Sequence, residues 1–173
     1  VHTHTQYVNL YLNGMFWGLY GLVERPDESF AEENLGGDKE DYDVLKGVRF
    51  GETALAALTN GTRDAWDAMF IAADRDLTDP INYAALQQYV DIDQLIDYNI
   101  TILYTGDRDG PTGIVAGQTT PKNFYALRHR SPEGRFRFYN WDADFTFEDT
   151  NVDMSEREGS QNPARLHFKL RAN

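Results

Sequence analysis

The chain has 173 residues, enough for one domain, or part of a larger one, to bury a core. With 28 acidic and 16 basic residues its formal net charge is −12, which argues against nucleic acid or an anionic membrane surface as a partner. The absence of cysteine excludes disulfides, thiolate metal sites and a cysteine nucleophile, and no apolar run approaches the ~18 residues of a membrane span.

The first expected element is a β-hairpin over residues 6–24. Residues 6–13 alternate in side-chain character and are rich in strand-forming residues. Asn13-Gly14 is the pair that best accepts positive φ at both central positions of a tight turn. Because the return segment is aromatic and apolar, the pattern predicts two antiparallel strands.

Helical patterns dominate the middle of the chain and recur at its end. Thr62 is the expected N-cap of a helix that reaches Asp74, and Pro80 separates that helix from the next. Asp91 or Asp93 is expected to cap a helix in which apolar residues recur at helical spacing. The other helices are expected over 27–35, 82–89 and 164–172, the last opened by Pro163, with a short strand over 42–46.

A long loop and a second hairpin follow the middle helices. Residues 105–121 hold four glycines, two prolines and two aspartates, and loops of this length in compact domains are often functional. Two strands over 123–130 and 135–141 are expected around the turn Ser131-Pro-Glu-Gly134. Asp142 and Asp144 come directly after this hairpin, and in an extended chain they would share one face.

This order of elements resembles the lower half of a protein kinase. There, a helix leads into a loop with a catalytic Asp and a metal-binding Asn, and a second Asp follows two short strands. The first Asp must orient or deprotonate a hydroxyl, while the Asn and the second Asp present oxygens to hard cations. The hairpin between Asn123 and Asp142 returns the chain to one edge, so both side chains can converge.

Three segments together resemble the spore-coat protein H (CotH) kinase family, a group of divergent, atypical protein kinases. They are residues 7–25, 122–128 and 138–147, which read YVNLYLNGMFWGLYGLVER, KNFYALR and FYNWDADFTF. The resemblance implies phosphorylation of protein Ser or Thr that depends on ATP and Mg²⁺. It assigns the catalytic role to Asp109 and metal binding to Asn123 and Asp142, with Asp144 as a second acidic position.

The chain departs from the family pattern in two places. Asp109 and Asn123 are 14 residues apart, which indicates an insertion over 113–121 and leaves Asp107 as an alternative catalytic residue. The family's N-terminal portion, with its phosphate-binding lysine, is expected to precede residue 1. On this basis Glu24 is expected near the hinge at the nucleotide, and Lys46 is a candidate phosphate contact.

The resemblance implies an α+β, divergent protein-kinase-like fold with a truncated upper lobe and two antiparallel β-hairpins around a helical middle. Residues 1–173 would form a single partial domain, with 1–25 as the remainder of the upper lobe and 26–173 as the lower lobe carrying the active-site loops. A coat or surface protein is a possible substrate, and the spore coat or the cell surface a possible location.

Two other functions remain open from the residues alone. The first is a kinase-shaped coat, surface or adhesion module without activity, which the acidic composition and the wide spacing of Asp109 and Asn123 would suit. The second is carbohydrate hydrolysis by paired carboxylates such as Asp109 and Asp142, for which the abundant aromatic residues could supply a sugar-binding surface.

Overall fold

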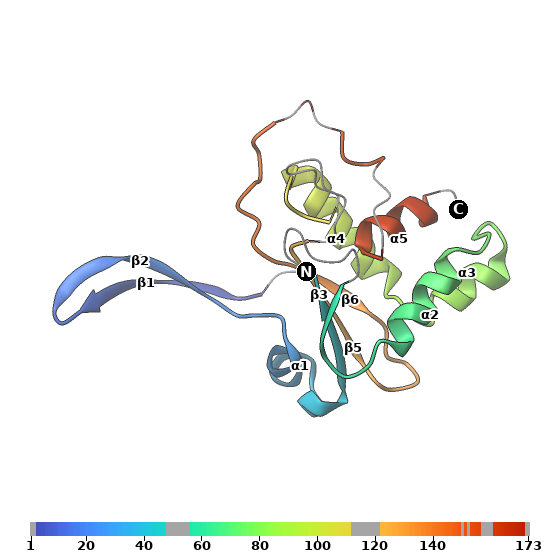
Figure 1. Cartoon of the computed structure of the whole chain (residues 1–173), viewed down its shortest axis with the longest axis horizontal. Helices are drawn as coiled ribbons and strands as arrows, with labels where there is room; N and C mark the ends of the chain where they lie inside the picture. The colour runs from blue at the N-terminus through green and yellow to red at the C-terminus, as the bar shows by residue number, and fades with distance from the viewer. Residues whose placement is uncertain are drawn as a thin grey trace.

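The computed structural model describes residues 3–47, 56–111, 122–149, 151, 153–156 and 161–171. Over these residues the chain is α+β, as predicted, with six strands and five α-helices. A two-stranded ribbon stands apart from a body built on a four-stranded antiparallel sheet of order β4-β3-β5-β6 (Figure 1). The elements are β1 (Thr5–Leu12), β2 (Met15–Val23), α1 (Glu28–Leu35), the 3₁₀ turn η1 (Lys39–Asp41), β3 (Tyr42–Lys46), β4 (Ala57–Asn60), α2 (Asp64–Ala73), α3 (Pro80–Leu86), α4 (Ile92–Thr105), β5 (Phe124–His129), β6 (Arg137–Asn140) and α5 (Pro163–Leu170).

The first hairpin forms as predicted and extends away from the body as an arm, residues 5–23 (Figure 1). Its strands pair from Thr5 opposite Val23 to Leu12 opposite Met15. Asn13 and Gly14 take φ angles of 51° and 80°, as the turn requires. Most of the arm's large apolar side chains are exposed on its two faces.

Local capping signals placed several helices correctly. Asp27 accepts hydrogen bonds from the first turn of α1, and Asp91, one of the two predicted caps, accepts from Gln94 N at the start of α4. Pro163 opens α5, with Asn162 as its N-cap. The predicted start of α3 was too late, because Pro80 is the first residue of that helix and Asp79 its cap.

The second hairpin, β5–β6, forms as predicted around a turn in which Gly134 N donates to Ser131 O at 3.0 Å. It is not an isolated hairpin, however, since β3 pairs along β5 from Tyr42 opposite His129 to Lys46 opposite Tyr125. The strand β4, which was not predicted, completes the sheet by pairing with β3.

Helices cover both faces of this sheet, so the body has two apolar cores. On one face, α2, α3, α4 and α5 pack around Trp66 and the sheet residues Leu45, Phe124, Ala126 and Phe138. On the other face, α1 packs through Phe30 and Ala31 on alternate sheet residues, which are Tyr42, Val44, Tyr125, Leu127 and Tyr139. Burial on both faces explains why four successive residues of β5, Phe124–Leu127, are all apolar.

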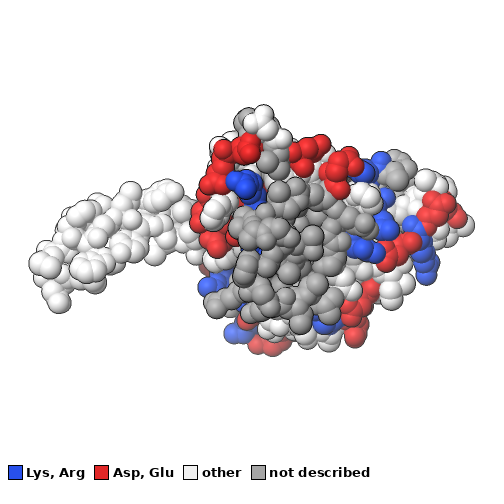
Figure 2. Space-filling model, turned by 45° about the horizontal axis from the view of Figure 1, so that its top comes forward, with Lys and Arg blue, Asp and Glu red and all other residues white. Residues whose placement is uncertain are grey.

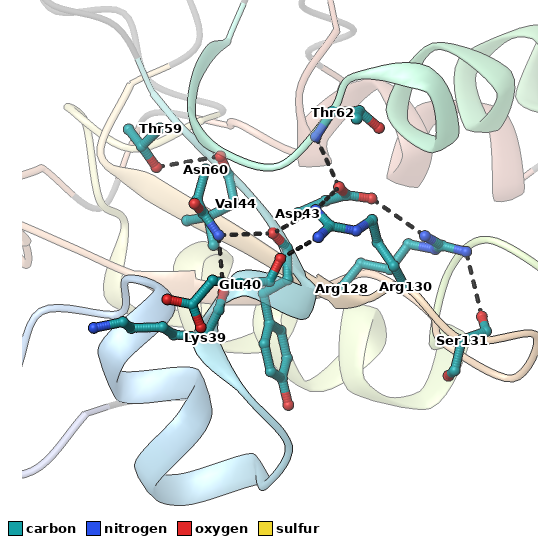
Figure 3. A network of polar contacts seen from close by, with 11 residues as sticks. Lys39, Glu40, Asp43, Val44, Thr59, Asn60, Thr62, Arg128, Arg130 and Ser131 are labelled. Atoms are coloured by element: carbon teal, nitrogen blue, oxygen red, sulfur yellow. Dashed lines mark hydrogen bonds and ion pairs between the residues drawn. The ribbon is translucent and has the colours of Figure 1, made fainter.

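A buried carboxylate ties the sheet to the start of α2 (Figure 3). Asp43 on β3 accepts hydrogen bonds from Thr62 N at 2.8 Å, Arg130 Nη1 at 3.4 Å and Arg128 Nη1 at 3.2 Å. Gly61 allows this approach, because a Cβ there would lie 2.4 Å from Asp43 Oδ1. Thr62 is therefore not the N-cap that the sequence predicted: its N–H is bonded to Asp43, and the cap position is Arg63.

Candidate active site

A cavity of about 570 Å³ lies at one end of the four-stranded sheet. Its wall comes from the end of β3, the start of β5 and the segment after β6, together with residues that follow β2 and α4. These residues are Arg25, Lys46, Gly47, Asp109, Lys122, Asn123, Phe124, Tyr125, Trp141 and Asp142. Three of the predicted site residues, Asp109, Asn123 and Asp142, thus line one cavity despite their separation in the sequence.

Polar contacts join these three residues directly. Asn123 Nδ2 donates to Asp109 Oδ2 at 2.9 Å and to the backbone oxygen of Asp142 at 3.3 Å. The other carboxylate oxygen of Asp109, Oδ1, is 2.8 Å from Lys122 Nζ. Asn123 therefore connects the loop after α4 with the segment after β6 through its side chain.

The backbone at this end of the sheet has an uncommon conformation. Asn123 and Asp142 have φ angles of 48° and 54°, in the left-handed region that Asn and Asp tolerate better than most residues. Asp142 is therefore not in the extended conformation in which it would share a face with Asp144, since β6 ends at Asn140. Gly47 permits the close packing of β3, because a Cβ there would lie 2.6 Å from the Lys122 carbonyl carbon.

Asp107, the alternative catalytic residue, is not among the residues that line the cavity and is 0% exposed. Its Oδ1 accepts a hydrogen bond from Asp109 N at 3.1 Å, so it supports the loop that carries Asp109. Burial, reinforced by the nearby carboxylates of Asp109 and Asp144, raises the pKa of Asp107 to about 6. Because it is enclosed, Asp107 is less suited than Asp109 to contact a substrate.

The loop after α4 is held against the segment after β6. Gly106 ends α4 in the left-handed conformation with a φ angle of 61°. Arg108 N then donates to Phe145 O at 3.1 Å, and Phe147 N donates to Thr105 O at 2.7 Å. These two bonds fix the segment of Asp142 next to the loop of Asp109.

The remaining predicted residues differ in their distance from the cavity. Lys46, at the end of β3, lines it. Glu24 does not line it but pairs with His4, whose Nδ1 is 2.8 Å from Glu24 Oε2. Asp144 is exposed after β6, and its charge acts on Asp107. The predicted insertion over 113–121 lies outside the described residues.

Sequence reasoning assigned no role to several residues of the cavity wall. The guanidinium of Arg25 lies 5.5 Å from the centre of the Trp141 ring, which in turn meets Tyr125 edge-to-face at 5.7 Å. Lys122 directly precedes Asn123, and this adjacency was the one signal that could have identified it.

The donor set suits a hard cation shared with a phosphate. Asn123 and Asp142 offer amide and carboxylate oxygens, the ligands of Mg²⁺ in proteins. Within the described part of the chain, no three His, Asp or Glu side chains form a metal-binding group. Mg²⁺ at nucleotide sites is usually held by one or two carboxylates and the phosphates themselves, so this smaller set fits it, and Arg25, Lys46 and Lys122 add the positive charge that phosphates need.

A second cavity, of about 340 Å³, lies between α4 and α5. Its lining is mainly apolar and includes none of the predicted site residues, so it is not the candidate site.

The architecture and the cavity therefore define an α+β protein with a cavity whose wall carries both carboxylate and cationic side chains. A family model described as CotH kinase protein matches residues 1–169, and the chain belongs to this family. No curated protein matches the chain at a significant level. None of the helices in the described ranges is long and apolar enough to span a membrane.

Proposed function

We propose that the protein is a kinase that transfers the γ-phosphoryl group of ATP to a Ser or Thr hydroxyl of a protein substrate. The single observation that carries this proposal is the meeting of Asp109, Asn123 and Asp142 at one cavity, with Asn123 bonded to both other residues. Membership of the CotH kinase family supports the same reaction class.

In this proposal Asp109 orients the acceptor hydroxyl and receives its proton. It lines the cavity, and its carboxylate is held from two sides by Lys122 and Asn123. A base fixed in this way needs little rearrangement when the hydroxyl arrives, which is how positioning lowers a barrier in phosphoryl transfer. Asp107 would act through the backbone bond that it accepts from Asp109.

Asn123 and Asp142 would hold Mg²⁺, with Asp144 as a further acidic group beside them. A bound Mg²⁺ supplies charge that neutralises the phosphate oxygens and fixes their orientation. Lys46 and Arg25, on the same wall, would contact phosphates. Glu24 pairs with His4 and does not line the cavity, and its predicted role in nucleotide binding near the hinge stays a prediction.

The test is transfer of labelled phosphate from ATP with Mg²⁺ to protein acceptors, followed by identification of the modified amino acid. Asp142→Ala should reduce the rate by about 100-fold or more, since it removes a group that stabilises transition-state charge. Asp97→Ala, which changes an exposed Asp on α4, is the matched control and should retain full activity. Full transfer by Asp142→Ala would overturn the proposal.

A second candidate is a kinase-shaped module without activity. The observation that favours it is the engagement of both oxygens of Asp109 by Lys122 and Asn123 in the resting protein. Calorimetry separates the two candidates, because a module without a nucleotide site should give no heat with millimolar ATP and Mg²⁺. Binding of Mg²⁺-ATP that Asp142→Ala weakens would instead support the kinase.

A further inference from the structure

The cavity between α4 and α5 is a second, separate hollow in the body. Its volume is about 340 Å³, near the lower end of the range of ~300–1,000 Å³ that small-molecule sites occupy. Residues of α4 and α5, together with Tyr83 of α3, form its wall, and none of them lines the cavity at the end of the sheet. Because the wall comes from packed helices, the cavity is formed before any ligand binds.

The apolar part of the wall is a stripe along α4. Ile92, Ile96 and Ile100 recur every four residues, so their side chains lie on one side of the helix. Ile96 and Ile100 are 51% and 60% exposed, and Leu170 of α5 lines the same cavity. A molecule with an apolar body would remove this surface from water, which favours its binding.

Two polar side chains in the wall are available to a ligand. Asn99 is 5% exposed, and its Nδ2 donates to Leu95 O at 2.8 Å. Within the described residues, nothing donates to Asn99 Oδ1, and the ring of His167 makes no hydrogen bond. Burial, reinforced by the charge of Arg171, lowers the pKa of His167, so its ring is neutral at pH 7 and offers one donor and one acceptor. Since buried polar groups are normally hydrogen-bonded, a ligand with a hydroxyl group would satisfy Asn99.

The charge of the wall selects against an ionic ligand. Among the wall residues that the structure describes, Arg171 is the one with a charge at pH 7. Both of its terminal nitrogens bond to Glu156, at 2.5 and 2.7 Å, and its guanidinium lies 4.5 Å from the centre of the Phe168 ring. Glu156 already neutralises Arg171, so a carboxylate or phosphate ligand would lose hydration without gaining a free cation.

We propose that the cavity between α4 and α5 binds an uncharged small molecule with an apolar body and one hydroxyl group, which donates to Asn99 Oδ1. A partner helix fits less well, because α5 supplies wall residues from little more than one turn, residues 167–171. A second copy of the chain fits less well too, since the exposed Asp93 and Asp97 on α4 would repel another chain of net charge −12.

The test measures, by calorimetry at pH 7, the binding of three probes that share one ring system: naphthol, methylnaphthalene and the naphthoate anion. Naphthol should bind at least about 10-fold more tightly than naphthoate, because the wall has no free cation for the carboxylate. Asn99→Leu should weaken the binding of naphthol by about 5-fold, the size of one neutral hydrogen bond, and should not weaken that of methylnaphthalene.

Ile100→Asp is a second variant at an exposed position, so its folding does not depend on the buried Asn99 amide. It places a charge in the wall and should weaken the binding of naphthol by about 10-fold or more. Ile71→Asp on α2, at a position that is 65% exposed and outside the cavity wall, is the matched control and should match the wild type.

Naphthol binding that Ile100→Asp leaves unchanged would place the probe elsewhere on the protein and overturn the proposal. Equal binding of naphthol and naphthoate, an unchanged affinity for naphthol in Asn99→Leu, or no binding by the wild type would do the same. An amphipathic peptide of Leu and Lys that displaces naphthol at lower concentration would assign the cavity to a partner helix. A dimer that Ile100→Asp dissociates in sedimentation would show that a second copy fills the cavity, and the proposal would again be wrong.

Discussion

The arm and the four-stranded sheet are both antiparallel and rich in aromatic residues. The apolar side chains of the arm are mostly exposed, however, whereas those of the sheet are mostly buried. Trp66, on α2 against the sheet, is 0% exposed and meets the rings of Phe70 and Phe136 at 5.1 and 5.3 Å. Trp17 in the arm is 58% exposed. The difference shows that apolar content does not make a core unless another layer covers it.

The two regions also differ clearly in their content of charged residues. Residues 5–23 contain no Asp, Glu, Lys or Arg, although these types make up 25% of the chain (Figure 2). Exposed sheet edges in natural proteins usually carry such residues, which prevent pairing with other strands, and a lone two-stranded ribbon is marginally stable. The arm is thus an exposed apolar ribbon without charged residues, and the expectation that residues 1–25 belong to an upper lobe stays a prediction.

The difference in burial between the arm and the body is tested most directly by truncating one tryptophan in each region. Trp66→Ala should lower the free energy of unfolding by about 3–5 kcal/mol, because it opens a cavity among four aromatic rings. Trp17→Ala should change it by less than about 0.5 kcal/mol, since the side chain is already largely hydrated. Denaturant unfolding followed by circular dichroism measures both.

A comparable loss from the two variants would contradict the comparison. It would mean that the arm packs against the body in solution, and the arm could then no longer be treated as a separate region. Equal slopes of the two denaturation curves would confirm that the variants unfold by the same transition.

The features that sequence could predict are those set by local chemistry. Asn13-Gly14 specifies its turn, and Asp91 and Pro163 mark the starts of their helices within a few residues. Tertiary contacts decided the rest: Thr62 was misassigned because its N–H bonds to Asp43, 19 residues earlier. The short strand β4 lacks a periodic signal and exists because β3 offers it an edge.

The candidate site, too, has features that the sequence could predict and features that it could not. The hairpin between Asn123 and Asp142 predicted that these two residues converge, because it returns the chain to one edge of a sheet, whereas the place of Asp109 was implied by the family resemblance. No pattern in the sequence indicates that Lys122 pairs with Asp109, since a lysine in a loop is usually hydrated. Nor does one indicate that Asp107 is enclosed while Asp109 reaches the cavity.

The second prediction concerns the body, whose enclosed carboxyl groups have no counterpart in the arm. The pKa of Asp107 rises from 3.8 to about 6 on folding, chiefly through burial. A raised pKa in an acid stabilises the folded state fully below the unfolded value, and this contribution is lost as the pH rises through the folded value. The loss should therefore occur between about pH 4 and pH 6.

Asp107→Asn removes this loss and should stabilise the protein at pH 7–8 by on the order of 2 kcal/mol, with a gain that disappears towards pH 4. Within the described residues, Asp107 Oδ2 is buried without a hydrogen-bond partner, and Oδ1 of the new Asn side chain can keep the hydrogen bond from Asp109 N. Thermal unfolding across this pH range measures the effect. A gain that did not depend on pH would show that Asp107 is not the titrating group.

The smallest expected change in stability tests the arm itself. Leu19→Lys places a charge on an exposed apolar position of β2 and should alter the free energy of unfolding by less than about 0.5 kcal/mol. It should nevertheless reduce the binding of a fluorescent apolar-surface dye and any self-association, because charge on an exposed strand opposes association. Ile81→Lys, at a similarly exposed position on α3, is the matched control and should leave both nearly unchanged. Equal losses of dye binding in the two variants would mean that the arm binds apolar molecules no better than an ordinary exposed apolar side chain on a helix. The arm and the body would then differ in burial alone.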